Sequence, residues 1–196
     1  MSHLNIIKKQ KISMIQSIIA NNEKQLVKLL APFIWKLSRN NNSLIIHTTR
    51  YNLEFVLSYL KINSLYKFSQ LADIIALDFP QQPIRFVVNY NLLSLFYSTR
   101  ILVQTKINEK LMLPSVVSLY SSSDWLEREV LDMFGIYFKY HTDLRRILTD
   151  YGFVGFPLRK DFPLTGYSEF YYNDNIQDIE NQRLFFFQAH RLLLNE

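Results

Sequence analysis

The most clearly marked helix in the sequence is SDWLEREVLDMFG, Ser123–Gly135, and it separates two regions of different composition. Asp124 followed three residues later by Glu127 resembles a capping box, and Gly135 suits a left-handed C-terminal cap. The pattern predicts a helix over 124–134. Apolar residues at helical spacing form its buried stripe: Leu126, Val130, Met133 and Phe134.

The polar residues of this helix are expected on its other face. Arg128 and Asp132 are four residues apart and can pair, which contributes only about 0.2–0.5 kcal/mol if the pair is exposed. Glu127 and Glu129 are about 200° apart around a helix, so their carboxylates do not converge as an acid and base pair. An ion-paired, capped helix is the favoured interpretation.

Upstream of this helix the chain predicts two helices and several successive strands. That order is typical of an α+β fold with a mostly antiparallel sheet and helices on one face, here assigned to a domain over residues 1–140. The last two predicted strands have polar residues between them and suggest a hairpin. The expected elements are helices over Met14–Leu37 and around Leu53–Leu60, and strands over Leu44–Thr49, Tyr66–Phe79, Ile84–Leu93 and Arg100–Ile107.

Downstream of this helix the sequence predicts a long irregular segment. Thr142 and Asp143 can begin a short helical turn over 142–147. In DYGFVGFPLRKDFPLTGY, residues 150–167, glycines and prolines prevent any long regular element. All four glycines of the chain lie between positions 135 and 166, so we expect positive φ or a close backbone approach in this segment. We interpret residues 141–196 as an extended C-terminal arm that docks on partner subunits.

Composition excludes several classes of site. The absence of cysteine rules out a disulfide framework, a thiolate zinc site and a cysteine-ligated iron-sulfur cluster on this chain. No stretch is long and apolar enough to predict a membrane span. The charge is uneven, because up to Leu53 only Glu23 opposes these basic residues: Lys8, Lys9, Lys11, Lys24, Lys28, Lys36, Arg39 and Arg50.

Motifs that would carry chemistry are weak. His3, His47, His141 and His190 lack the spacing of metal ligands. Gly152 and Gly155 form a GxxG pattern, but glycines needed in turns are a better interpretation than a phosphate-binding loop. A basic nucleic-acid-binding module remains as the alternative function, carried by Arg145, Arg146, Arg159 and Lys160, although interleaved aspartates would oppose a phosphate backbone.

The chain resembles a known family at several blocks of fixed spacing. Glu127, Asp132, His141, Arg145 and Ile147, followed by LRRILTDYGF (144–153) and PLRKDFPLTGY (157–167), resemble the signature of the thirty-kilodalton subunit family of respiratory complex I. The family has bacterial members as well as organelle-encoded ones, and the latter are called NADH dehydrogenase subunit nine. The close match covers Trp125 to Tyr167, and a weaker one extends back to Arg85.

The resemblance implies a non-catalytic core subunit of the peripheral, matrix-side arm of NADH:ubiquinone oxidoreductase. Such a subunit supports assembly of the quinone-reducing module, in electron transfer from NADH to ubiquinone coupled to proton translocation. It implies no cofactor on this chain, with flavin, iron-sulfur clusters and ubiquinone bound by neighbours. The forty-nine-kilodalton quinone-site subunit is the expected partner, at the mitochondrial inner membrane. A composition typical of AT-rich genomes, rich in Ile, Asn, Lys, Phe and Tyr, favours an organelle-encoded chain.

The signature and the arm also supply the residues expected at the partner interface. Arginines and aromatic residues are enriched at interface hot spots, which favours those types as anchors. The expected interface residues are Glu127, Arg128, Asp132, His141, Arg145, Arg146, Asp150, Phe153, Arg159, Lys160, Asp161, Phe162 and Tyr167.

Overall fold

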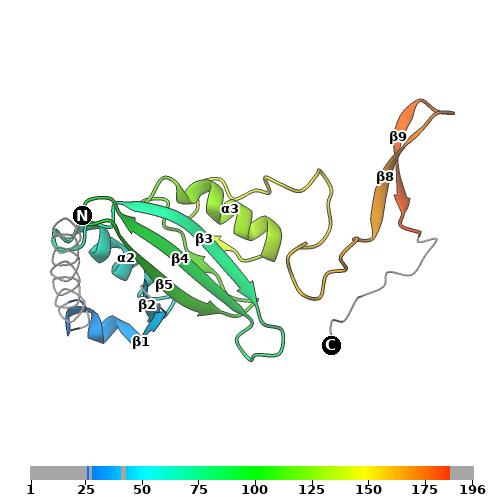
Figure 1. Ribbon diagram of the computed structural model, residues 1–196. Helices are drawn as coiled ribbons and strands as arrows, with labels where there is room; N and C mark the ends of the chain where they lie inside the picture. The colour runs from blue at the N-terminus through cyan, green and yellow to red at the C-terminus, as the bar shows by residue number, and fades with distance from the viewer. Residues whose placement is uncertain (1–25, 27, 41–42, 186–196) are drawn as a thin grey trace, which may run out of the picture.

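The computed structural model describes residues 26, 28–40 and 43–185 of the 196-residue chain. A five-stranded sheet in the order β1-β2-β5-β4-β3 forms the centre of the domain (Figure 1). Its strands are β1 (Ile34–Asn40), β2 (Ser43–Thr48), β3 (Gln70–Asp78), β4 (Phe86–Ser94) and β5 (Thr99–Ile107).

The sheet is mostly antiparallel, as expected. The pairs β1·β2, β3·β4 and β4·β5 are antiparallel, whereas β2 and β5 run parallel. The predicted hairpin of β4 and β5 is confirmed, with Phe86 opposite Ile107 and Ser94 opposite Thr99. A short parallel pair joins β6 (Leu113–Pro114) and β7 (Phe138–Lys139), which flank the helix α3 (Ser123–Phe134) in the sequence.

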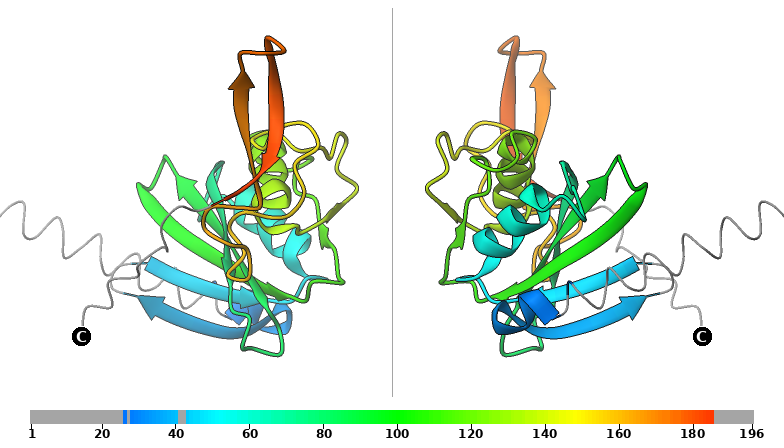
Figure 2. Two further views of the ribbon diagram at one scale, coloured as in Figure 1. Left: turned by 90° about the vertical axis from the view of Figure 1, so that its right-hand side faces the viewer. Right: turned by 90° about the vertical axis from the view of Figure 1, so that its left-hand side faces the viewer.

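Two helices cover one face of the sheet, which confirms the predicted class. They are α2 (Leu53–Ile62) and α3 (Ser123–Phe134), and both lie on the same side in Figure 2. Side chains spaced along one stripe of α2 are fully buried because they face the sheet: Leu53, Val56, Leu57 and Leu60. The sheet contributes large buried side chains such as Phe86 and Tyr90 to the same core.

The sequence-based helix over Met14–Leu37 is wrong at its C-terminal end. Residues 28–30 are helical and η1 (Ala31–Phe33) adds a 3-10 turn, but Ile34–Asn40 is the edge strand β1. Pro32 ends the helix, and pairing with β2 then outweighs helical spacing. The remainder of that prediction lies outside the described residues.

Beyond β7 the chain is irregular up to β8 (Ser168–Asn173), which pairs with β9 (Asp178–Arg183) in a hairpin that projects from the domain (Figure 1). The sequence did not predict this hairpin. Gly152, Gly155 and Gly166 have φ of 73°, 114° and 76°, as expected, and Gly135 caps α3 with φ of 72°. These backbone angles strongly favour glycine.

Candidate partner interface

The buried carboxylate of Asp132 on α3 holds the first part of the arm against the domain. Oδ2 accepts hydrogen bonds from the backbone N–H groups of Leu148 at 2.7 Å, Thr149 at 2.8 Å and Ile147 at 3.3 Å. Oδ1 accepts from the Thr149 hydroxyl at 2.6 Å and from Arg146 at 3.3 Å. The backbone of 147–149 has no ladder of its own, so Asp132 satisfies donors that burial would otherwise leave unpaired.

The same contacts decide the ionisation of Asp132. Burial alone would raise the pKa of this carboxyl, but the hydrogen bonds from Thr149, Leu148 and Ile147 hold the pKa below its usual value. The side chain is fully buried and charged at neutral pH. The signature aspartate is therefore a structural ligand for the arm.

Glu127 and His141 form a second set of buried contacts, between α3 and the start of the arm. Glu127 Oε1 accepts a hydrogen bond from the Val116 N–H at 2.7 Å, and burial raises the pKa of this carboxyl. The fully buried imidazole of His141 donates from Nε2 to the Asp124 carbonyl at 3.2 Å, while Nδ1 accepts from the Asp143 N–H at 3.1 Å. His141 Nε2 also lies 3.9 Å from Glu127 Oε2.

A third set of contacts lies at the end of the sheet, on Asp78 of β3. Arg85 binds both Asp78 oxygens, at 2.7 and 2.8 Å, and the N–H of Lys160 donates to Oδ2 at 2.9 Å. The Arg85 guanidinium holds the pKa of Asp78 below its usual value and also pairs with Asp161 at 3.0 Å. Sequence reasoning missed Asp78 and Arg85, because only the fold brings them beside residues 160–161.

Arg159 fills the space beside the C-terminus of α3. Its Nε donates to the Phe134 carbonyl at 2.6 Å, its Nη1 pairs with Glu109, and its guanidinium lies 4.4 Å from the ring centroid of Phe156. A Cβ on Gly135 would lie 2.6 Å from atoms of both Arg159 and Phe156. Gly135 is thus required by packing as well as by its left-handed backbone.

These contacts correct three sequence-based expectations. No side-chain capping bond forms at the N-terminus of α3, because Glu127 bonds Val116 instead of closing a capping box with Asp124. The polar face of α3 is buried under the arm, and Asp132 pairs with Arg146 rather than with Arg128. Residues 142–147 form no helical turn, since their path follows the Asp132 contacts.

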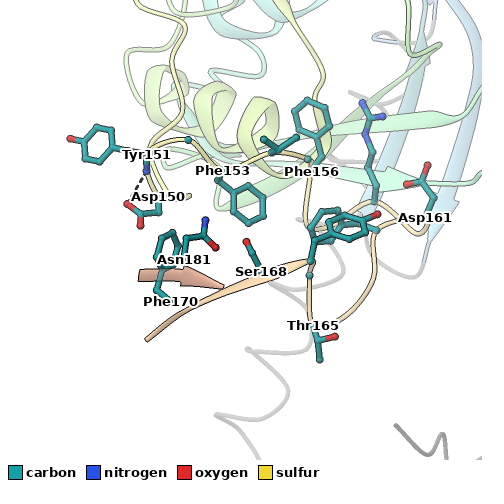
Figure 3. A pocket seen from close by; sticks show the side chains of 16 residues that line it. Asp150, Tyr151, Phe153, Phe156, Asp161, Thr165, Ser168, Phe170 and Asn181 are labelled. Atoms are coloured by element: carbon teal, nitrogen blue, oxygen red, sulfur yellow. Dashed lines mark hydrogen bonds between the residues drawn. The ribbon is translucent and has the colours of Figure 1, made fainter. Parts of the chain in front are cut away.

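The arm and the hairpin enclose an open hollow of about 810 Å³ (Figure 3). Aromatic side chains dominate its lining: Phe153, Phe156, Phe162, Tyr167 and Phe170. Phe162 lies 5.9 Å from Phe153 and 5.5 Å from Tyr167 between ring centroids, and it also closes on Gly155, where a Cβ would meet its ring at 2.5 Å. The backbone of the arm is therefore shaped around this aromatic cluster.

Large apolar side chains are left in solvent along the arm. Tyr151 is fully exposed, and Val154 and Leu164 are each 83% exposed. On the hairpin, Phe170, Tyr172 and Ile179 share one exposed face, because Phe170 and Tyr172 are two residues apart and Tyr172 pairs with Ile179. Grouped exposed apolar side chains of this kind mark a candidate protein interface.

The expected interface residues fall into two groups. Most of the side chains already engage the domain or the aromatic cluster: Glu127, Arg128, Asp132, His141, Arg146, Phe153, Arg159, Asp161 and Phe162. The second group is exposed, although Tyr167 also packs on Phe162: Arg145, Asp150, Lys160 and Tyr167. Of the four cations considered for phosphate binding, Arg146 and Arg159 are used within the chain, which weakens the nucleic-acid alternative.

Within the described ranges, no group of three or more acidic or histidine side chains is arranged to hold a metal ion. The described part of the chain also has no helix that is long and apolar enough to cross a membrane.

Comparisons with known proteins agree on one family. A model described as respiratory-chain NADH dehydrogenase, 30 kDa subunit, matches residues 46–168. NADH-ubiquinone oxidoreductase subunit 9 of Reclinomonas americana is 45% identical over 159 residues, which are 81% of this chain and 78% of the relative. The mitochondrial NADH-ubiquinone oxidoreductase 30.4 kDa subunit of Neurospora crassa is 44% identical over 166 residues, 85% of this chain and 59% of that protein.

A solved structure shares the fold of the domain. The trypsin-resistant fragment of Nqo5 superposes with a TM-score of 0.55 and 29% sequence identity. The likeness covers 63% of this chain and 99% of the fragment.

Proposed function

Because the chain belongs to the 30 kDa subunit family of the respiratory-chain NADH dehydrogenase, we propose that it is a non-catalytic core subunit of the peripheral arm of NADH:ubiquinone oxidoreductase. In this role it supports assembly of the quinone-reducing module. Electron transfer from NADH to ubiquinone, with the coupled proton translocation, belongs to the complex. Flavin, iron-sulfur clusters and ubiquinone are bound by neighbouring subunits. The mitochondrial naming of a relative supports a mitochondrial location, and the proposed role would put the chain on the matrix side of the inner membrane.

The observation that carries this proposal is the exposed apolar surface of the arm. Residues 141–162 are tied to the domain through Asp132, Asp78 and His141, which fixes the path of the backbone. That path leaves Val154 and Leu164 in solvent. Fixing the arm in advance lowers the conformational entropy lost on docking, so the apolar area contributes more fully to affinity.

Burial separates the residues of the arm into two proposed roles. The paired residues, such as Asp132 and Arg159, shape the arm, while exposed ones such as Tyr167 and Lys160 touch the partner. The partner is the large quinone-site subunit, and the domain over residues 1–140 is the unit from which the arm extends.

A charge placed on this surface tests the proposal. Val154→Asp and Leu164→Asp, introduced into the full chain in its own cells, should leave folding unchanged because both side chains point into solvent. Each aspartate would be buried on docking and cost about 2 kcal/mol or more, which weakens binding more than about tenfold. Native gels should show the variant chain outside the large complex.

The matched control is Ile62→Asp on α2, where the side chain is 80% exposed. This variant should enter the complex at the wild-type level. Normal assembly of both arm variants, at equal expression, would contradict docking through this surface.

A further inference from the structure

The sheet has a second face that neither helix covers. Pairing across the strands puts Ile45, Leu102 and Asp73 in one row with Asn91, because paired residues point to the same side. The next row contains, in spatial order, Lys36, His47, Gln104, Asn89 and Ile75. We call this side, opposite α2 and α3, the outer face.

Aliphatic side chains occupy much of the outer face. Antiparallel sheets with one solvated face usually alternate apolar residues inward with polar residues outward. Here Ile75 and Leu77 are 43% and 41% exposed. These two residues and three partly exposed ones in the paired rows form the aliphatic part of the face: Ile45, Ile75, Leu77, Leu93 and Leu102. Val87 in the same rows is buried.

A polar strip crosses the middle of the outer face, and its side chains are hydrogen-bonded in pairs, although His47 Nδ1 is buried without a partner among the described residues. Gln104 Nε2 donates to Asn89 Oδ1 at 2.7 Å, and the Ser38 hydroxyl is hydrogen-bonded to His47 Nε2 at 2.6 Å. Burial, together with the nearby charge of Lys36, lowers the pKa of His47, so the ring is neutral at neutral pH. Another protein can cover this strip without breaking those hydrogen bonds.

An exposed tryptophan lies at the edge of the same face. Trp35 is 56% exposed, and its ring lies 5.3 Å from the ring of His47 between centroids. Tryptophan is enriched among the residues that contribute most to binding at protein interfaces. Its position extends the apolar surface onto β1.

The charges of the outer face are mostly positive. Lys36 is exposed at the β1 end of the polar strip, Lys106 is exposed in the row beside it, and Arg100 is exposed opposite Leu93. The acid in these rows is Asp73. Cationic side chains beside aliphatic ones are complementary to a protein surface that places carboxylates beside apolar side chains.

We propose that the outer face is a second docking surface, occupied in the assembled complex by a partner protein whose apolar contact residues are flanked by aspartates or glutamates. The inference goes beyond the docking of the arm, because no outer-face residue belongs to residues 141–196. It therefore predicts a contact that persists when the arm is altered.

Single cysteines give a direct measure of coverage, since the chain has none of its own. The variants Ile75→Cys and Leu77→Cys are made in the full-length chain. Each is labelled with a maleimide in two states, as the free chain and within the intact complex. We expect labelling in the complex to be at least tenfold slower at both positions. Equal rates in the free chain and in the complex would overturn the proposal. Labelling of Ile62→Cys in the same two states gives the reference for general crowding.

A carbodiimide crosslink identifies the chemistry of the occupant, because it joins a lysine amine directly to a carboxylate. The expected products join Lys36 or Lys106 to an aspartate or glutamate of another protein of the complex. Lys36→Glu with Lys106→Glu should raise the labelling rate of Ile75→Cys in the complex at least tenfold, while Lys110→Glu, in an exposed loop, should not. Protection that disappears on nuclease treatment would overturn the proposal and assign the face to RNA or DNA.

Discussion

Replacing Asp132 with alanine should release residues 147–149 from the domain. The carboxylate accepts five hydrogen bonds from the arm, three of them from backbone N–H groups that have no partner in a ladder. A hydrogen bond to a charged group contributes about 1.5–3 kcal/mol, but these five are not additive, because water replaces the lost partner as the loop relaxes. Breaking a buried charge pair costs about 3–5 kcal/mol, and we expect Asp132→Ala to fall in that range.

That loss is a large share of the roughly 5–15 kcal/mol by which a domain is stable. With a urea slope of about 2 kcal/mol per molar, the unfolding midpoint should fall by about 1.5–2.5 M. Hydrogen exchange should show the amides of residues 147–149 losing protection before the strands of the sheet do.

The pH dependence follows from the lowered pKa of Asp132. An unfolded aspartate titrates near 3.9, so the stabilisation is fully present above about pH 5 and is lost as pH falls through the lower folded pKa. The difference in unfolding free energy between wild type and Asp132→Ala should be constant from about pH 5 to 8 and should shrink below about pH 4.

Asp143→Ala is the matched control. Asp143 pairs with Arg145 at 3.0 Å, but both side chains are more than half exposed, so the loss should stay below about 1 kcal/mol. The reasoning is refuted if Asp132→Ala costs no more than this control and the amides of residues 147–149 remain protected.

Two further predictions concern a buried acid and a pair of glycines. Burial raises the pKa of Glu127, so the charged carboxylate destabilises the fold as pH rises above about 4.3, the pKa of glutamate in the unfolded chain. The stability of Glu127→Gln relative to wild type should therefore increase between about pH 4 and 7. A stability difference in urea unfolding that stays constant over this range would contradict the prediction. Gly155→Ala should lower the free energy of unfolding by about 1–3 kcal/mol, because φ is 114° and the new Cβ meets Phe162. Gly152→Ala, whose Cβ would have nothing within 4 Å, should lower it by about 1 kcal/mol. Equal urea midpoints for the two variants would show that the contact with Phe162 does not matter.

Local patterns predicted much of the domain. The apolar stripe of α2, the strands β2, β4 and β5 and the left-handed cap at Gly135 were all predicted, because each depends on residues close together in the chain. The edge strand β1 was predicted as a helix, since helical spacing near Pro32 does not reveal that β2 lies beside it.

The polar face of α3 shows where local patterns end. Helical spacing places Asp132 away from the apolar stripe of α3. The sequence therefore predicts that Asp132 is exposed unless another segment covers that face. The arm covers it instead, and its backbone donors make a buried carboxylate favourable. Asp78 meets Lys160 and Arg85 meets Asp161 across more than seventy residues of sequence, so no motif marks them.

The sequence by itself determined the family, the α+β class and the positions where glycine is needed, because those features are recorded in short-range spacing. The tertiary structure decided which charged residues are used inside the chain and which aromatic and aliphatic ones remain in solvent. Burial depends on the summed contacts of segments distant in sequence. A carboxylate such as Asp132 therefore becomes an internal ligand only once the arm has folded over α3.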